Sequence, residues 1–334
     1  MVRQAELLVD LNKIKENISN IERNVIPIVK ANAYGTGIEG MFKVIEELEI
    51  NIVGVAIVDE GIKLRSLGYQ GSILIINQPF IEEIPAIIEN NITAGVCSLE
   101  FMRELNKYNA KVHVEIDTGM GRTGVQPNEV DNFLQELNKL KNIEVEGIYT
   151  HFATIEYAKN QIEVFKTIIS KFKDLKYIHA SSSAGTINNI DNLICNYARP
   201  GIMLYEDATK LKTKISYIKE VEVGTSISYG RTYIADKKRT IGTIPLGYAD
   251  GIKRTLSNNG NVVINDKLAP IVGVICMDSF MVDLTDIAEA EIGMDVYIWD
   301  NKNITLNEIA DRCNTINYEI LSTISSRVPR KYEF

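Results

Sequence analysis

The sequence predicts an α/β protein in which a (β/α)8 barrel of the TIM type is followed by a mostly antiparallel β domain. Between residue 25 and about residue 204, eight short apolar runs alternate with longer segments of helical period. After about residue 210, apolar runs follow one another with turn residues between them. The length of 334 residues suits two domains. We therefore expect a barrel domain over 1–210 and a β-strand domain over 211–334.

The eight apolar runs are the predicted barrel strands. Segments between them, such as residues 38–49 and 161–172, repeat apolar residues at i, i+3, i+4 and i+7, which indicates one buried helical face. Strands that alternate with helices form a parallel sheet, and eight of them fit a closed barrel better than an open sheet. The runs begin near residues 25, 52, 72, 92, 111, 144, 176 and 197.

The second half carries the strand signals of an antiparallel domain. Its apolar runs are separated by GTS, ADG, NNG and ND, which are typical turn sequences. Two helices are expected near its end, over about 305–313 and about 318–325. The runs themselves are KISYIKEVEV, RTIGTIPLGY, NVVIN, LAPIVGVIC, FMVDL and DVYIW.

Composition excludes several classes of protein. The net charge of −8, without a long basic run, argues against nucleic acid or an anionic membrane as partner. No apolar run approaches the ~18 residues of a spanning helix, and the start lacks the layout of a signal peptide, so we expect a cytoplasmic protein that acts on small molecules. The four cysteines are far apart and the histidines number three, so we expect free thiols and no metal site.

Polar residues gather where the predicted barrel strands end. The reacting groups of such barrels lie at the carboxyl ends of the strands. Lys30, His151 and Arg199 end or follow the first, sixth and eighth runs, and the serines of SSSAG follow the seventh. Desolvation at a barrel mouth lowers the pKa of an amine, which suits a lysine that forms a Schiff base. The alternative for Lys30 is a solvated loop lysine.

The fifth predicted strand leads into the glycine-rich segment GMGRTG. Its glycine spacing fits a dinucleotide-binding motif, but that motif belongs to the first βα turn of an open sheet, so we set it aside. Arg122 in this segment could bind a carboxylate or form a surface salt bridge. Glu115 and Asp117 share one face of the strand with His113 and need donors, for which Arg122 is a candidate. The alternative to a catalytic role for these acids is a structural ion pair at the barrel rim.

Eight segments together resemble the alanine racemases, which are fold-type III enzymes dependent on pyridoxal 5'-phosphate. They lie in the order of that family from near residue 25 almost to the end of the sequence. The resemblance implies an isomerase that converts L-alanine to D-alanine for peptidoglycan, as a homodimer with shared active sites. The segments are PIVKANAYGTG, EIDTGMGRTG, HFAT, ARPGIMLY, SISYGRTY, IPLGYADG, ICMDSFMVDL and NYEILSTISSRVPRKY.

The resemblance also implies roles for individual residues. Lys30 would form a Schiff base with the cofactor and act as one base, and Tyr229 of the partner subunit would act as the other base. Two bases on opposite faces of the α carbon are what racemisation requires. His151 and Arg199 would supply cationic surroundings for Tyr229. Arg199 would also contact the pyridine nitrogen, and His151 would support Tyr229 and the cofactor. Arg122 and the Met277 backbone would bind the substrate carboxylate, Tyr248 would line the entrance, and Asp278 would have a supporting position. The residues that would bind the phosphate are Tyr34, Ser183, Gly201, Ile202 and Tyr318.

One departure from the family pattern concerns Glu115. Many members have a carbamylated lysine seven residues before the substrate arginine, and this chain has Glu115 there. A glutamate supplies the negative charge without carbon dioxide. Our hypothesis is that Glu115 orients Arg122, directly or through water.

Two other functions stay open at the level of sequence. The quoted segments do not measure the room for a substrate side chain, so a racemase of serine or lysine is an alternative. A non-catalytic barrel that binds pyridoxal phosphate is an alternative from another class. Such a protein would need neither Tyr229 nor a β domain, and the second half of about 120 residues argues against it.

Overall fold

The computed structural model describes residues 4–334 and divides them into two compact units. The barrel unit contains Lys15–Ala33 and Met41–Leu204. The β unit contains the described residues up to Ile14, together with Tyr34–Gly40 and Tyr205–Phe334. The chain therefore passes between the units several times.

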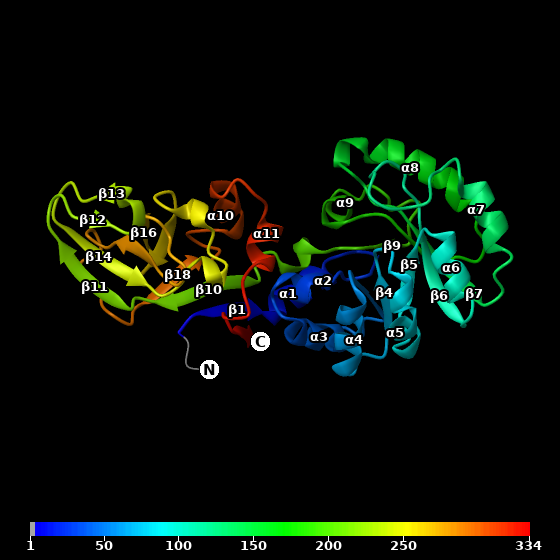
Figure 1. The fold of residues 1–334 in the computed structure, drawn as a ribbon, viewed down its shortest axis with the longest axis horizontal. Helices are drawn as coiled ribbons and strands as arrows, with labels where there is room; N and C mark the ends of the chain where they lie inside the picture. Colours follow the sequence, from blue (N-terminus) through cyan, green and yellow to red (C-terminus); the bar gives the residue numbers. More distant parts are fainter. Residues whose placement is uncertain (1–3) are drawn as a thin grey trace. The chain divides into compact units, whose positions relative to one another are not determined.

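The barrel unit is built on an eight-stranded parallel sheet in the order β2-β9-β8-β7-β6-β5-β4-β3. A parallel bridge between Ile28 and Gly54 joins the first strand to its other neighbour and nearly closes the barrel. The sequence prediction of an eight-stranded barrel is confirmed (Figure 1). The strands are β2 (Asn24–Val25), β3 (Ile52–Val55), β4 (Ser72–Ile75), β5 (Thr93–Val96), β6 (Ala110–Glu115), β7 (Ile143–Tyr149), β8 (Tyr177–His179) and β9 (Tyr197–Ala198).

The first barrel strand, β2, is shorter than the apolar run that predicted it, because that run contains Pro27. Proline has no backbone N–H and so interrupts the ladder after β2. The pairing continues past it, since the Ile28 N–H donates to the Pro200 carbonyl and the Val29 N–H donates to the Gly54 carbonyl, each at 2.9 Å. These bonds hold the chain just before Lys30 between two neighbouring strands.

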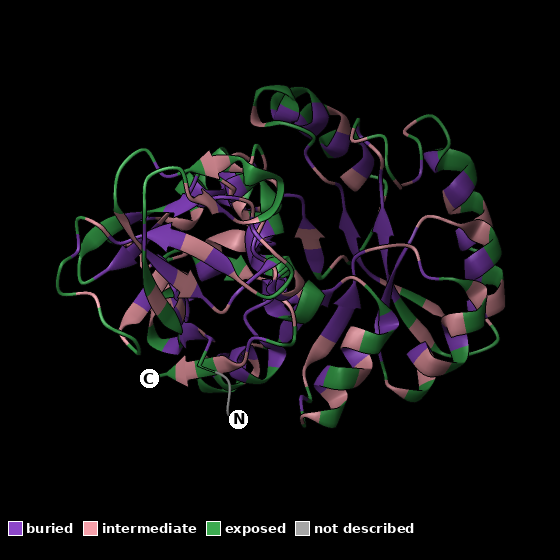
Figure 2. Cartoon of the chain, turned by 60° about the vertical axis from the view of Figure 1, so that its left-hand side comes forward, coloured by how far each residue is buried: buried purple, intermediate pink, exposed green. Residues whose placement is uncertain are grey.

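Amphipathic helices alternate with the barrel strands along the chain. Ser98 and Thr154 cap two of them, each accepting a backbone N–H with its hydroxyl. Figure 2 shows the strands buried and the outer faces of the helices exposed. The helices are α1 (Leu11–Ser19), α3 (Ile38–Glu47), α4 (Val58–Ser66), α5 (Ile84–Glu89), α6 (Leu99–Leu105), α7 (Val130–Leu137), α8 (Ile155–Ile169) and α9 (Ser183–Ile187).

The β unit contains a nine-stranded sheet and a separate hairpin. The sheet order is β11-β14-β17-β16-β15-β18-β10-β1-β19, and its pairs are antiparallel except β1 with β19. The prediction of a mostly antiparallel second part is confirmed. The strands are β1 (Glu6–Asp10), β10 (Thr209–Lys214), β11 (Tyr217–Val221), β14 (Arg239–Ile244), β15 (Asn261–Ile264), β16 (Lys267–Val272), β17 (Phe280–Asp283), β18 (Asp295–Trp299) and β19 (Arg330–Glu333), with the hairpin β12 (Ser226–Ile227) and β13 (Tyr233–Ile234).

The β unit closes with two short helices, α10 (Leu306–Arg312) and α11 (Asn317–Ser322). Thr305 caps α10 in a capping box with Glu308. The early strand β1 pairs with β10 and β19, so a segment from within 1–210 belongs to this sheet. The predicted domain boundary near residue 210 therefore does not separate all residues of the two units, and it stays a prediction. Over residues 4–334, no helix is long and apolar enough to cross a membrane.

Candidate active site

Lys30 stands where the first barrel strand ends and is half-buried. Burial lowers the pKa of its amine, the positive charge of Arg122 lowers it further, and the Glu60 carboxylate acts in the opposite direction. Among residues 4–334, its Nζ has no hydrogen-bond or ion-pair partner. A desolvated and unpaired amine at a barrel rim suits attack on a carbonyl group.

The backbone after Lys30 forms a left-handed turn, α2 (Lys30–Tyr34). Ala31, Asn32, Ala33 and Tyr34 have φ values of 52°, 55°, 53° and 55°. This conformation costs about 1–2 kcal/mol for each residue other than glycine. Four such residues in succession, none of them glycine, mark a strained segment directly beside Lys30.

Arg199 lies buried at the end of β9. Its Nη2 donates to the carbonyl oxygens of Thr150 and Ala180, at 2.5 and 2.9 Å. Its guanidinium also lies over the Tyr149 ring, 5.1 Å from the centroid. The Nε is buried and has no partner among the described residues. A buried donor without an acceptor fits a ligand that brings one, such as an aromatic ring nitrogen.

His151 follows β7 and lies beside Arg199, with 3.3 Å between its Nδ1 and the Arg199 Nη2. Burial, together with the charges of Arg199, Arg122 and Lys30, lowers the pKa of His151 to about 3. The imidazole is therefore neutral at neutral pH. The expectation that His151 contributes positive charge is wrong, which leaves Arg199 as the cation of this pair.

Glu115 is buried in the barrel, where it accepts hydrogen bonds from two hydroxyl groups. The Thr123 Oγ1 donates at 2.8 Å and the Tyr149 hydroxyl at 3.3 Å. Burial raises the pKa of the Glu115 carboxyl, and the Thr123 hydrogen bond and the Arg199 charge oppose that shift. Arg122 itself is exposed and has no hydrogen-bond or ion-pair partner within residues 4–334. The direct Glu115–Arg122 contact that we considered is therefore absent.

Glu115 instead fixes the loop that carries Arg122, through the next residue, Thr123. Asp117 fixes the same loop, because its Oδ1 accepts the N–H groups of Gly119 and Gly121 at 3.1 and 3.0 Å. The loop is therefore held by carboxylates at its base while the Arg122 guanidinium stays free to bind an anion.

The barrel interior holds a chain of polar side chains whose mutual contacts were not predicted from the sequence. The His113 Nδ1 lies 2.8 Å from the His179 Nε2, and the His179 ring stacks on Tyr149 with centroids 5.0 Å apart. Both histidines are fully buried. They face the interior from β6 and β8, as Tyr149 does from β7. Alternation along its strand places His113 on one face with Glu115, and the same count along the next two runs could have indicated Tyr149 and His179.

Ser183 and Gly201, which follow the seventh and eighth predicted strands, lie together in the barrel unit. The Ser183 hydroxyl oxygen accepts the N–H groups of Gly201 at 2.9 Å and Met203 at 3.3 Å. Ile202 begins the short helix η2 (Ile202–Tyr205), next to this bond. The structure thus brings three of the predicted phosphate-binding residues together.

The other two predicted phosphate-binding residues lie together in the β unit. The rings of Tyr34 and Tyr318 have centroids 5.9 Å apart, and Tyr34 also contacts Tyr205 at 5.3 Å. Tyr34 is buried, whereas Tyr318 is partly exposed at the start of α11.

Tyr229 projects from the β unit, with 71% of its surface exposed. It begins the short helix η3 (Tyr229–Arg231), and the preceding Ser228 has φ 66° and ψ −174°, a conformation otherwise adopted almost only by glycine. The Ser228 hydroxyl donates to the Val274 carbonyl at 2.5 Å. This hydrogen bond ties the strained residue to the chain leading out of β16.

Met277 and Tyr248 come from two loops of the β unit that are bonded to each other. The Tyr248 N–H donates to the Cys276 carbonyl and the Ala249 N–H to the Met277 carbonyl. A Cβ on Gly247 would lie 2.2 Å from the Met277 oxygen, so this approach requires glycine. Asp278 accepts a hydrogen bond from Arg327 at 2.7 Å.

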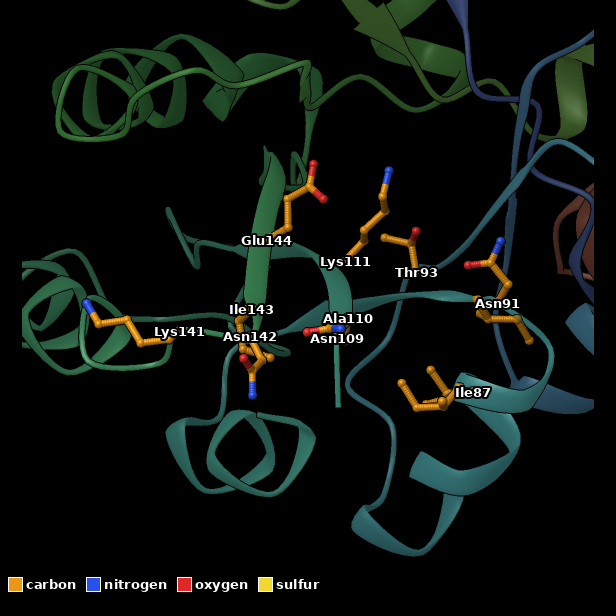
Figure 3. A pocket seen from close by; sticks show the side chains of 12 residues that line it. Ile87, Asn91, Thr93, Asn109, Ala110, Lys111, Lys141, Asn142, Ile143 and Glu144 are labelled. Atoms are coloured by element: carbon orange, nitrogen blue, oxygen red, sulfur yellow. The ribbon is translucent and has the colours of Figure 1, made fainter. Parts of the chain in front are cut away.

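A cavity of about 380 Å³ lies at the opposite end of the barrel from Lys30. Lys111, Thr93 and Glu144 line it near the amino ends of their strands (Figure 3). None of the predicted site residues lines this cavity. The predicted site residues of the barrel unit lie instead at the carboxyl ends of its strands.

This combination defines a class of protein: a barrel enzyme with a β-sheet unit, a lysine at the end of its first strand and a buried arginine at the end of its last. The model of the alanine racemase N-terminal domain matches residues 9–209, and the model of the C-terminal domain matches residues 208–332. The chain belongs to the alanine racemase family and is an isomerase.

Relatives and solved structures agree over nearly the whole chain. Alanine racemase 2 of Caldanaerobacter subterraneus subsp. tengcongensis is 37% identical, over 99% of this chain and 95% of the relative. The structure of alanine racemase from Clostridium difficile 630 is 35% identical, with a TM-score of 0.93 over 100% of this chain and 96% of that chain. Alanine racemase from Bacillus anthracis with bound L-Ala-P is 32% identical, with a TM-score of 0.92 over 100% and 96%.

Proposed function

We propose that the chain interconverts L-alanine and D-alanine with bound pyridoxal 5'-phosphate, supplying D-alanine for peptidoglycan. The observation that carries the proposal is the family match over residues 9–332, joined to an unpaired and desolvated Lys30 at the barrel rim. When bound, pyridoxal phosphate withdraws electrons from the α carbon of an amino acid and so acidifies its α proton.

The residues of this chain fit that cofactor at several points. Lys30 would hold its aldehyde carbon, and the unpaired Arg199 Nε would donate to the ring nitrogen. Because arginine offers only donors, Arg199 would leave the ring nitrogen unprotonated, which would limit side reactions such as transamination. The residues proposed for the phosphate are Tyr34, Ser183, Gly201, Ile202 and Tyr318.

Two side chains are proposed to move the α proton. Racemisation takes a proton from one face of the α carbon and delivers one to the other face, so two bases on opposite sides are needed. The Lys30 Nζ would serve one face and the Tyr229 hydroxyl the other. The lowered pKa of Lys30 brings it closer to neutral pH, which favours its use as a base.

Tyr229 is proposed to act in the active site of a partner subunit, in a homodimer. The high exposure of the Tyr229 ring on its own unit supports this, since a large exposed aromatic ring favours a contact with another surface. Arg122 and the Met277 backbone are proposed to bind the substrate carboxylate. The unpaired Arg122 guanidinium has the fork geometry for that task.

The direct test is incubation of the purified protein and pyridoxal phosphate with L-alanine, L-serine and L-lysine in turn, followed by chiral separation. We expect D-alanine as the main product. Borohydride reduction should fix the cofactor on Lys30, as read by peptide mass. The absence of any D-amino acid would overturn the proposal, and a faster conversion of serine or lysine would reassign its substrate.

A further inference from the structure

The left-handed turn after Lys30 needs stabilising contacts from residues outside the turn. Four successive residues with φ near +55° persist only where their surroundings fix them. Inside the turn, the Ala33 N–H donates to the Val29 carbonyl at 2.9 Å, which closes one loop of chain around Lys30. The N–H of Ala31, the residue directly after Lys30, donates to a side chain from another element.

That side chain is Glu60, in the first turn of α4. Its Oε1 accepts the Ala31 N–H at 2.5 Å, and its Oε2 accepts the Ala56 N–H at 2.8 Å. One carboxylate thus joins the residue after Lys30 to the chain leaving β3. The carboxylate is held firmly, because a negative charge at a helix N-terminus is favoured by the helix dipole.

The negative charge of Glu60 also acts on the Lys30 amine and raises its pKa. The charged groups of other elements that act on the Lys30 amine are Arg122, Arg199 and Glu60, and the titratable His151 is in turn affected by the charge of Lys30. The two arginines disfavour the protonated amine, and His151 is neutral. Glu60 is the group that favours the protonated amine.

We propose that Glu60 is a positioning residue for Lys30: its carboxylate holds the left-handed turn in place and balances the positive charge around the amine. This inference rests on the proposed function of Lys30. Replacement of Glu60 should therefore change both the reactivity of the Lys30 amine and the precision with which it is placed.

The test measures the Lys30 amine itself, in the full-length chain freed of cofactor. Competitive labelling with an amine reagent at a series of pH values, read by peptide mass, gives the pKa of Lys30. Glu60→Gln should lower that pKa by about one unit, because a nearby negative charge is removed. The control is Asp59→Asn, a change at the exposed neighbouring acid on α4, which should leave it unchanged.

Kinetics of the loaded enzyme separate positioning from charge. Glu60→Gln keeps the size of the side chain, whereas Glu60→Ala removes the hydrogen bonds to the Ala31 and Ala56 N–H groups. We therefore expect kcat to fall at least tenfold in Glu60→Ala and less in Glu60→Gln. KM should stay within threefold of the wild-type value in both variants. If Glu60→Ala does not fold, the labelling of Glu60→Gln still decides. An unchanged Lys30 pKa in a folded Glu60→Gln protein overturns the inference. A wild-type protein without racemase activity would instead overturn the proposed function, while the labelling still reports on Glu60.

Discussion

The segments that carry Lys30 and Tyr229 share a strained backbone but differ in how their own unit treats the side chain. Each proposed base lies beside residues of positive φ, Ala31–Tyr34 in one case and Ser228 in the other. Lys30 is half-buried, and burial together with the charges of Arg122 and Arg199 lowers its pKa. Tyr229 is 71% exposed, and the hydroxyl of its neighbour Ser228 donates to the Val274 carbonyl.

The difference teaches that the pKa of one proposed base, Lys30, is set within its own unit, whereas the other proposed base, Tyr229, is exposed on the surface of its unit. A buried amine has its pKa set by desolvation and neighbouring charge. An exposed phenol acquires such surroundings only when another surface covers it. On the proposed function, strained backbone serves two purposes in this chain: it fixes the buried Lys30 among its neighbours, and it holds the exposed Tyr229 for a partner subunit.

The largest effect is expected for Tyr229→Phe. Loss of a general base costs about 10²–10⁴-fold in rate, while the cofactor on Lys30 should keep its visible absorption. Initial rates in both directions, with the absorption spectrum, check this. Tyr217→Phe, at another exposed tyrosine of the β unit, is the control and should keep full activity. Full activity of Tyr229→Phe would show that the Tyr229 hydroxyl is not a catalytic base.

A smaller effect is expected for Ser228→Ala, which removes the hydrogen bond to the Val274 carbonyl. Such a bond contributes about 1 kcal/mol, so a loosened Tyr229 should lower kcat about fivefold with little change in KM. Ser226→Ala, in the adjacent strand β12, is the matched control. Equal kcat values for the two variants would mean that Tyr229 does not depend on this tie.

Glu115→Gln should act on substrate binding and spare the cofactor. The change weakens the acceptor of the Thr123 hydroxyl and loosens the loop that carries Arg122. We expect the KM to rise about threefold, because a charged hydrogen bond becomes a neutral one. Steady-state kinetics and a cofactor titration measure the two effects. An unchanged KM would sink the role of Glu115.

The smallest effect concerns His151 and pH. Since the pKa of His151 is lowered to about 3, its ring loses the proton far below neutral pH and stays neutral from pH 5 to 8. The ring-proton NMR signals of His151, assigned with a His151→Gln variant, should not shift over that range. A titration near pH 6.5 would show that the imidazole carries charge, and would restore it as a cation beside Arg199.

Much of the fold could be predicted from the sequence, because the period of the apolar residues and the order of strands and helices along the chain can be recognised locally. The eight barrel strands and six later strands, β11 and β14 to β18, were found from apolar runs, whereas β10, β19 and the hairpin β12–β13 were not. Strand β1 was missed, since ELLVD is a short run whose partners β10 and β19 lie far along the chain. Pairing across such distances leaves no local pattern.

The candidate site was predictable in its residue types and less so in its contacts. Strand ends located Lys30, His151 and Arg199, but the partners of Glu115 proved to be Thr123 and Tyr149. The contact of Glu60 with the turn after Lys30 had no sequence signal, because the carboxylate reaches that turn only after β3 and α4 have packed. Burial also makes His151 neutral, which its residue type alone does not reveal.

The central claim, that Lys30 and Tyr229 serve opposite faces of the α carbon, is tested most directly by hydrogen tracing in the wild-type enzyme. Unlabelled L-alanine is converted in D2O, and the first D-alanine formed is examined by mass spectrometry. With two bases, the base that delivers the proton is not the one that removed it, so the product should carry solvent deuterium at the α carbon. Transfer of a substantial fraction of the substrate's own α hydrogen into D-alanine would contradict the account.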